Sequence, residues 1–587
     1  MRFAIAIVSL FLTGSAAAQH FHHHHAEPSE QGQFRRSPCQ KDYTKPVSNK
    51  DLQKVPWNVP AKNQAAKDYF NQGMTLYYGF NFEEAARAFK AALGEDDKMA
   101  MAAWGVALAS GPNININMQG KCAEQALNYS KLAVDLSKTQ PGITDREKRI
   151  INAMAARYAN GLDSVAYSTA LRLLWNDDVK AGKTDPNLIS LFTESLMDLR
   201  PWGLFDNAHR AALDTKQLVI ALEDAVKADK ASVGANHLLI HAVEAGPNPG
   251  TAQDAANRLA GLVPKSGHLV HMPSHIHLLT GNFAKAVEDN SAAIEVDFKQ
   301  YSEKCAGSFN TYWANPDCPA VYYGHYLGHN HFFRSVAAAF AGQRANALVS
   351  ALATREHVQD FVVNEPGLQR YMTAPLMMLA AHQQWGDVLN QPEPPKGCFA
   401  QDPFPEDTGC HILRATRWWA RGMAHAYTGQ RDLAIGDYKA MTGEMAKIAP
   451  PTPTGWGNNT AAAVLAVPSE LLLARIAWAA DKRDEAIEHL KLAVTHEDAM
   501  VYDEPPQWFA PSREALGGAY LHVGRFELAK ETFLAELRNH PDSGRALYGL
   551  WRAYVGLKED DFAKQTKVRF DRAWKTADYE MSDQKLW

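Results

Sequence analysis

Residues 512–541 read SREALGGAYLHVGRFELAKETFLAELRNHP. Apolar residues recur there at i, i+3 and i+4, which is the spacing of one face of an α-helix. The same periodicity begins at Ala61 and continues through most of the remaining chain, with no stretch that alternates as a strand does. The sequence therefore predicts an all-helical fold.

The 512–541 stretch resembles a tetratricopeptide (TPR) repeat, a 34-residue unit of two antiparallel helices. The matches occupy the places of the small and large residues that lock the two helices together: Leu516, Gly517, Tyr520, Gly524, Ala529, Phe533 and Pro541. Three more units follow the same pattern: Gly73, Ala85 and Phe89; Gly422, Gly429, Ala434 and Tyr438; Ala474, Ala486, Leu490 and Ala493. The resemblance implies an all-α, TPR-like helical-hairpin solenoid that curves around a concave groove.

Four stretches rich in glycine, proline or asparagine interrupt the repeat period: 110–120, 302–319, 392–408 and 449–459. Insertions between repeats tend to fall on one face of a solenoid, so we expect these to cap or narrow the groove. The predicted division of the chain has four parts: a signal peptide at 1–18, a polar His-rich segment at 19–60, a first TPR-like solenoid at 61–300, and a second at 301–587 that continues the same superhelix.

The N-terminus has the parts of a secretory signal peptide. Arg2 precedes an apolar run at 3–12, and small residues at 15–18 predict cleavage before Gln19. No cysteine follows the cleavage site, so we expect no lipid anchor, and no other apolar run is long enough to predict a membrane span. These features predict a periplasmic or secreted protein.

The overall charge gives no sign of a nucleic-acid or anionic membrane partner. The 587 residues include 60 basic and 65 acidic side chains, for a net charge of −5. Six cysteines are an even number, and an exported chain without a C-x-x-C motif favours structural disulfides. The candidate pairs are Cys305–Cys318 and Cys398–Cys410, which each bracket a loop, and the remaining Cys39–Cys122.

Two His-x3-His pairs give the strongest functional signal. His237 and His241 lie in GANHLLIHAVEAG, and His271 and His275 lie in GHLVHMPSHIHLL. Each member of the second pair follows its counterpart by 34 residues (271 − 237 = 34 and 275 − 241 = 34), which is one TPR period. Residues four apart share a helix face, so the two pairs are predicted to be in register on neighbouring repeats.

The TPR register places both pairs, together with His268 and Glu244, on the helix face that lines the groove in TPR proteins. First helices of adjacent repeats pack about 8–10 Å apart. Imidazoles at matched heights on two such helices are then expected to converge on one metal ion or two. A third pair, His325 and His329, lies on the same predicted face, although the 302–319 insertion disturbs its register.

Acidic residues are weaker candidates. Two glutamates, Glu194 and Glu244, are potential oxygen ligands or general bases. Glu194 shares a predicted helix face with Asp198, and the simpler interpretation is that this is a solvated acidic face. Asp503 and Glu504 lie in a loop that enters the last repeats. They are expected either to close the groove or to form a turn that caps the following helix.

Three segments are similar to those of a group of exported bacterial TPR proteins: HLVHMPSHI at 268–276, YYGHYLGHNHFF at 322–333 and YDEPPQWFAPSREALG at 502–517. The resemblance implies a fold and no reaction. TPR grooves in general bind peptides or partner proteins, and they typically do so through Asn, Lys and Arg, whereas this chain offers histidine.

Two functional hypotheses follow. In the first, the seven groove histidines bind a transition metal, with copper most favoured and zinc or iron as alternatives. His-x3-His pairs on neighbouring helices are also similar in geometry to dinuclear copper sites. A redox-active metal would indicate an oxidoreductase that acts on a small molecule or peptide in the groove, and zinc would indicate a hydrolase. In the second, the chain is a metal-free scaffold for a peptide or protein partner.

Overall fold

The computed structural model describes most of the chain after the predicted leader. The described residues are 39, 52, 55–115, 120–305, 318–362, 365–394, 398, 408–448 and 457–587. The predicted signal peptide and the histidines at 20 and 22–25 lie outside them, as does most of each predicted insertion at 302–319 and 392–408.

The described residues form helices and no strands, which confirms the all-α prediction. The first half of the chain contributes α1 (Gln64–Tyr78), α2 (Phe82–Glu95), α3 (Ala100–Ala109), α4 (Gly120–Ser137), α5 (Asp145–Tyr158), α6 (Ser164–Lys180), α7 (Pro186–Met197), α8 (Thr215–Ala228), α9 (Val233–Val243), η3 (Pro249–Ala252), α10 (Gln253–Leu262), α11 (Gly267–His271), α12 (Pro273–Leu279) and α13 (Phe283–Lys304).

The second half continues the same organisation. Its elements are α14 (Ala320–Tyr322), the π-helical turn η5 (Tyr323–Leu327), α15 (Gly328–Phe340), α16 (Arg344–Val358), η6 (Pro366–Thr373), α17 (Ala374–Ala381), α18 (Trp385–Leu389), α19 (Thr408–Tyr427), α20 (Arg431–Met445), α21 (Ala461–Ala479), α22 (Arg483–Asp498), α23 (Ser512–His522), α24 (Phe526–Asn539), α25 (Gly544–Leu557), α26 (Asp560–Ala573) and α27 (Asp583–Leu586).

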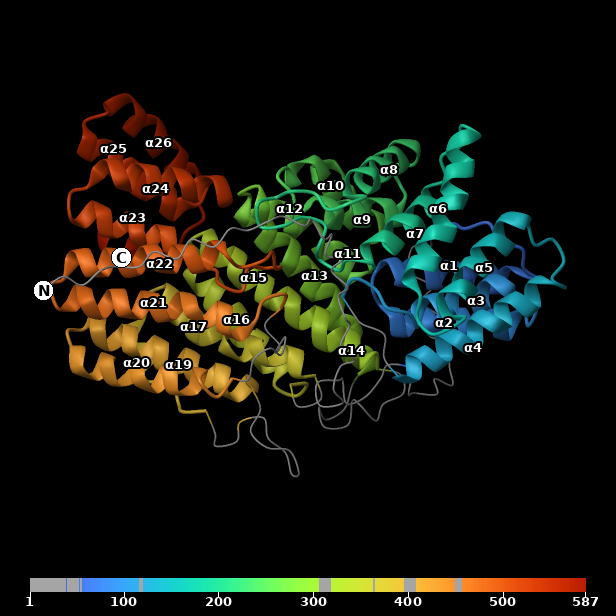
Figure 1. The fold of residues 1–587 in the computed structure, drawn as a ribbon, viewed down its shortest axis with the longest axis horizontal. Coiled ribbons are helices and arrows are strands. Elements are labelled where there is room, and N and C mark those ends of the chain that lie inside the picture. The colour runs from blue at the N-terminus through green and yellow to red at the C-terminus, as the bar shows by residue number, and fades with distance from the viewer. Residues whose placement is uncertain are drawn as a thin grey trace, which may run out of the picture.

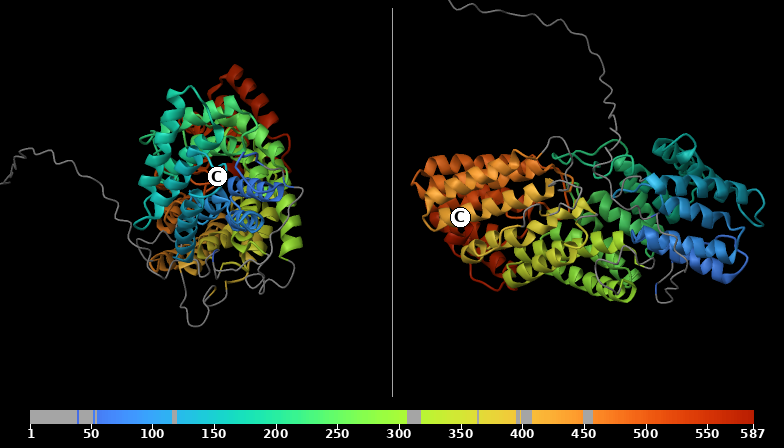
Figure 2. Two further views of the ribbon diagram at one scale, coloured as in Figure 1. Left: turned by 90° about the vertical axis from the view of Figure 1, so that its right-hand side faces the viewer. Right: turned by 90° about the horizontal axis from the view of Figure 1, so that it is seen from below.

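Consecutive helices pack as antiparallel hairpins, among them α1–α2, α15–α16, α19–α20 and α23–α24. The hairpins stack along the long axis of the molecule, from α1–α5 at one end to α19–α26 at the other (Figures 1 and 2). This arrangement is the TPR-like solenoid that the repeat pattern predicted.

Glycines lock the hairpins at the places that the resemblance indicated. The ring of Phe89 fills the space beside both Gly73 in its own hairpin and Gly105 in the next helix, and a Cβ at either glycine would overlap it. Phe533 lies in the same way between Gly517 and Gly549. Each large ring therefore packs one repeat against the next, which explains why the small residues recur at this period.

The C-terminal repeats fold back against the middle of the solenoid. The turn before α13 packs so closely on the turn after α24 that a Cβ at Gly281 would overlap the carbonyl oxygen of Pro541. The ring of His540 stacks on Phe340 with centroids 4.9 Å apart. Asp578 accepts hydrogen bonds from the backbone N–H groups of Arg344 and Ala345 at the start of α16. These contacts bring the loop between α22 and α23 over α9 and α12.

All three predicted disulfides are present: Cys39–Cys122, Cys305–Cys318 and Cys398–Cys410. The described residues contain no free cysteine. Such pairing is typical of proteins that fold in an oxidising compartment.

One helix of the described residues, α21, is long and apolar enough to meet the length and composition of a membrane span. Its apolar window is 61% buried inside the protein. The prediction that no apolar run after the leader is long enough for a span was therefore wrong by length and composition. In the structure α21 packs against α22 and α19 as a core helix of the solenoid.

Candidate metal centre

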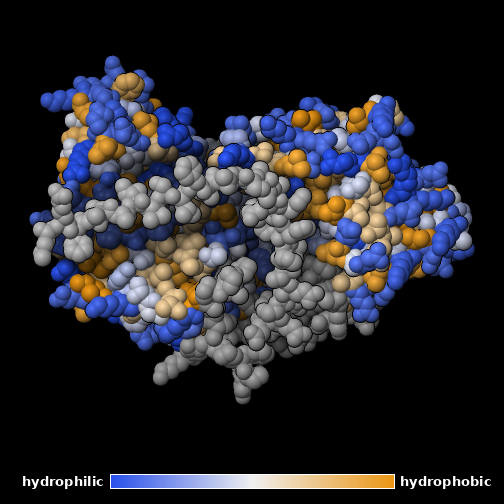
Figure 3. Space-filling model, viewed as in Figure 1, coloured by the Kyte–Doolittle hydropathy of each residue, from blue (hydrophilic) through white to orange (hydrophobic). Residues whose placement is uncertain are grey.

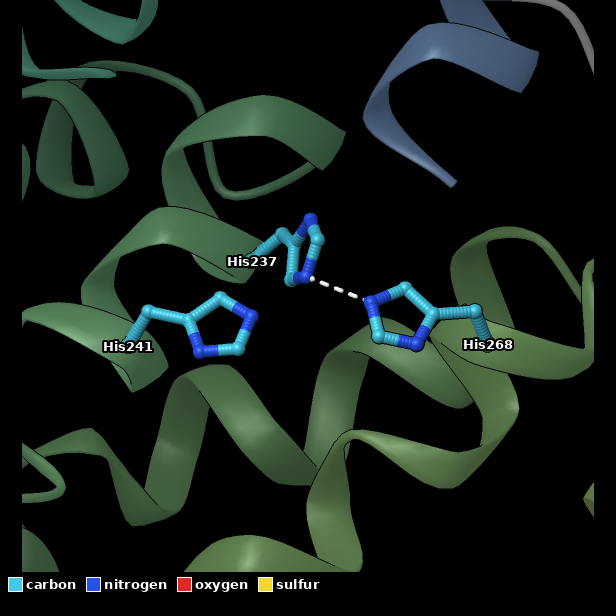
Figure 4. Close-up of side chains that lie close together, drawn as sticks. All are labelled: His237, His241 and His268. Carbon is cyan, nitrogen blue, oxygen red and sulfur yellow. Dashed lines mark hydrogen bonds between the residues drawn. The ribbon is translucent and has the colours of Figure 1, made fainter. Parts of the chain in front are cut away.

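Three histidines from two helices converge in the interior of the solenoid. His237 and His241 lie one turn apart on α9, and His268 lies on α11. One ring nitrogen from each lies within 4.8 Å of the others. The Nε2 atoms of His237 and His268 are 3.1 Å apart, and the ring of His241 points its edge toward that pair (Figure 4).

A second triplet adjoins the first. His271 ends α11, His275 lies on α12, and His329 lies on α15, with ring nitrogens again within 4.8 Å of one another. The Nε2 atom of His271 lies 2.7 Å from that of His275 and 3.1 Å from that of His329. The sequence had indicated three pairs and His268, and the structure brings five of the paired histidines together with His268 as two triplets.

The two triplets share their helices, so they form one continuous group. Because His268 and His271 are three residues apart on α11, their ring centroids are 6.0 Å apart although they belong to different triplets. The rings of His241 on α9 and His275 on α12 are 5.8 Å apart. This spacing suits two neighbouring ions with three imidazoles each.

Aromatic rings cover one side of each triplet. Phe80 packs on His237, His241 and His268, with centroids 4.6–5.7 Å apart. Phe333 packs on His271, His275 and His329 in the same way, with centroids 5.0–5.6 Å apart. Five of the six histidines are buried, and His329 is half-buried. The imidazoles are therefore held in an apolar shell.

Hydrogen bonds orient three of the rings through their outer nitrogens. The Nδ1 atoms of His241 and His275 donate to the two oxygens of Glu244, at 2.6 and 2.7 Å. His271 Nδ1 donates to Asn290 Oδ1 at 2.7 Å, since the Asn290 amide nitrogen donates to a backbone carbonyl. Each bond assigns a proton to Nδ1 and turns Nε2 inward, so that Nε2 of a neutral ring directs its lone pair into the group, as in metal-binding histidines.

These lone pairs lack donors. His241 Nε2 is buried with no hydrogen-bond partner among the described residues. His271 Nε2 and His275 Nε2 lie 2.7 Å apart, and two lone pairs at that distance repel unless a cation, either a proton on His275 or a metal ion, lies between them. Metal–nitrogen bonds of about 2.0–2.1 Å in a tetrahedral site place two ligand nitrogens about 3.3 Å apart. The two separations of 3.1 Å are close to that value. The 2.7 Å between His271 and His275 would widen when a metal ion replaces the proton, so the residues fit a metal.

Burial and neighbouring charges tune the histidines for this role. Burial, with a smaller effect of adjacent imidazoles, holds the pKa of His237, His268, His271 and His329 well below the usual value, so these rings are neutral. Burial also lowers the pKa of His275, but the carboxylates of Glu504 and Glu244 outweigh it and raise the pKa to about 10. The same two carboxylates favour a metal cation at this place.

Glu504 connects the centre to a cavity of about 1110 Å³. The cavity is lined by Glu244, His275, Phe333 and Glu504 at the metal centre, and it opens between α12 and the C-terminal repeats. The space-filling view shows a notch beside these repeats (Figure 3). Burial and the nearby Glu244 carboxylate raise the pKa of Glu504 to about 8, with His275 acting in the opposite direction.

Two predicted site residues lie elsewhere. His325 Nε2 faces Glu365, 3.2 Å away, and not the six-histidine group. His325 lies in the π-helical turn η5, whose wider turn rotates it away from the face that His329 occupies. Glu194 is buried beside Tyr77, and its helix neighbour Asp198 pairs with Arg157 at 2.8 Å. Glu194 therefore belongs to a separate buried network.

Glu244 bonds to the outer nitrogens of two histidines, and it also forms a third possible metal-binding group with His241 and Glu504, whose ligand atoms lie within 4.8 Å of one another. Its predicted role as a ligand or base stays a prediction. Sequence reasoning did not include Asn290, Phe80 or Phe333 in the site. It placed Glu504 only in a loop that closes the groove. The Glu504–Pro505–Pro506 run was the visible signal, because prolines fix a loop's direction and a charge beside them is then held in place.

No family model and no curated protein matches the chain. Solved structures that it resembles include human IFIT1 in a dimer with m7Gppp-AAAA (12% identity, 89% of this chain and 92% of that one, TM-score 0.30). Others are yeast Tom70 (10%, 89% and 93%, 0.27) and Ypp1 (10%, 90% and 84%, 0.36). These similarities are too low to inform function. The hairpins and their glycine locks make the chain a TPR-type helical solenoid.

Proposed function

We propose that this chain is an exported metalloprotein that holds two transition-metal ions in a centre of six histidines inside its solenoid. The observation that carries the proposal is the arrangement of His241, His271 and His275. Each has its Nδ1 proton bonded to an outer acceptor and its Nε2 directed into the group. His241 Nε2 has no partner there, and the Nε2 atoms of His271 and His275 face each other at 2.7 Å. A cation is the partner that satisfies all three.

Copper is the favoured ion. Each of the two triplets consists of imidazole nitrogens alone. Such a set suits copper or zinc, whereas iron and manganese usually take carboxylate ligands as well. Among divalent first-row ions, nitrogen sites bind copper most tightly. The two acidic residues nearest the group, Glu244 and Glu504, contact the outer nitrogen of His275 and leave its inner nitrogen free.

With copper bound, we infer that the protein is an oxidoreductase whose substrate occupies the adjoining cavity. Bound copper would supply electron transfer with the substrate. The chain's own residues exclude water with Phe80 and Phe333, fix the imidazoles with Glu244 and Asn290, and place Glu504 at the side of entry. Zinc in the same centre would favour hydrolysis instead, because zinc activates bound water at neutral pH.

Elemental analysis tests the proposal directly. The mature chain is purified without a histidine-affinity step and without His20 and His22–His25, since that segment could itself retain metal. We expect about two transition-metal ions per chain, predominantly copper. A chain without metal, in a sample shown to be folded by circular dichroism, would contradict the proposal and favour the metal-free peptide or protein scaffold.

Glu244 provides a finer prediction. Glu244→Gln weakens the hydrogen bonds that orient His241 and His275, and outer partners of this kind contribute about 10- to 100-fold to metal affinity. We expect metal competition with a chelator to show a loss of that size. Glu444→Gln is the matched control, because Glu444 accepts from His411 Nδ1 at 2.7 Å outside the centre. Equal affinity in both variants would contradict the role of Glu244.

A further inference from the structure

The inner end of the cavity contains two buried acceptors that lack a donor. Glu504 Oε2 lies 2.7 Å from His275 Nδ1, but the N–H of that nitrogen is directed to Glu244, so the oxygen accepts no hydrogen bond among the described residues. Gln507 is 2% exposed, and its Oε1 is also without a partner in that part of the chain. Both residues line the cavity. Buried acceptors are costly when unpaired, so they indicate a ligand that donates hydrogen bonds.

The other carboxylates that line the cavity are already engaged. Their donors are as follows: Arg210 for Asp206, Arg513 for Asp498, the backbone N–H of Asn458 for Asp503, that of Ser512 for Glu497, and His241 for Glu244. The inner end therefore offers hydrogen-bond acceptors, and the other carboxylates of the cavity are not available to pair with a cationic ligand. An ammonium group would also be repelled by metal cations in the centre. These features favour a neutral O–H donor.

The inner walls are aromatic. Phe333 lies against the second histidine triplet, and Tyr502 and Trp508 flank Glu504 in the sequence and line the same cavity. Flat, partly apolar walls of this kind bind aromatic rings by stacking and edge contacts. The outer part differs, since the exposed side chains of Asn207, Asn248 and Asn539 line it. The volume of the cavity is also far larger than that of one aromatic ring.

We propose that the cavity binds a phenol with a polar extension, whose hydroxyl donates to Glu504 beside His275. The ring lies between the aromatic walls, and the extension reaches the amides near the mouth. This inference rests on the proposed metal centre for the chemistry that follows binding, while the binding itself requires only the cavity. Glu504 acts as a positioning residue that selects the O–H group.

The test compares 4-ethylphenol with its methyl ether, 4-ethylanisole, which has the same ring and lacks the donor. Dissociation constants are measured by NMR titration of the full mature chain without oxygen, so that no turnover occurs. A hydrogen bond of ordinary strength predicts about threefold to tenfold tighter binding of the phenol. Equal dissociation constants for the two probes in the unaltered protein would overturn the inference.

Three variants test whether Glu504 causes the preference for the phenol over its ether. Glu504→Leu is expected to abolish it, and Glu504→Gln, which keeps the shape and one acceptor, to retain part of it. Asp206→Asn, an exposed change in the same cavity, is expected to leave it unchanged. An undiminished preference in Glu504→Leu would overturn the inference, and if that variant does not fold, Glu504→Gln decides in the same way. Metal content measured on the same samples keeps failure of the metal centre separate.

Discussion

Replacing His241 and His275 together by alanine is expected to lower the bound metal at least tenfold. Each triplet then keeps only two imidazoles, and the bridge through Glu244 loses both of its donors. Two ligands per ion hold a transition metal far more weakly than three, since a missing ligand leaves a coordination position to water. Elemental analysis after dialysis against a mild chelator measures the change.

His325→Ala is the matched control for that experiment. His325 also belongs to a His-x3-His pair in the sequence, yet its ring faces Glu365 and lies outside the two triplets. We expect this variant to keep its full metal content. Circular dichroism should report the same helical content for all samples, because alanine is a good helix former. Metal retained by the double variant, or lost equally in His325→Ala, would contradict the six-histidine centre.

The centre was partly predictable because its strongest feature is local and periodic. His237, His241, His271 and His275 repeat at one TPR period, and the fold converts that period into parallel helices with matched faces. His268 followed from the same register. The metal itself remains a prediction, as neither the fold nor the matched proteins test it.

The parts that sequence reasoning missed depend on contacts between distant repeats. Glu504 reaches His275 only because the C-terminal hairpins fold back over the middle of the solenoid, and repeat periodicity contains no information about such closure. Asn290 lies on the second helix of its hairpin, which the groove-lining positions leave out. His325 was misplaced because a π-helical turn shifts the register by a fraction of a turn.

Gly281→Ala is expected to loosen the packing of the C-terminal repeats against the middle of the solenoid. Gly281 has φ of +81°, which disfavours alanine, and its Cβ would overlap the carbonyl oxygen of Pro541 in the facing turn. The two effects together are expected to lower the free energy of unfolding by about 2–4 kcal/mol. Thermal unfolding followed by circular dichroism should show a lower midpoint, and amides in α24 and α25 should exchange with solvent faster.

Gly429→Ala is the control that separates the effect of backbone strain from the effect of losing the contact with Pro541. Gly429 lies in the equivalent turn between α19 and α20 with φ of +79°, and no atom lies within 4 Å of its Cβ position. This variant should lose only about 1 kcal/mol and leave exchange in α24 and α25 unchanged. Because the closure holds Glu504 at the centre, Gly281→Ala should also weaken the preference for a phenol over its ether. Equal behaviour of the two glycine variants would mean that the Pro541 contact does not position the site.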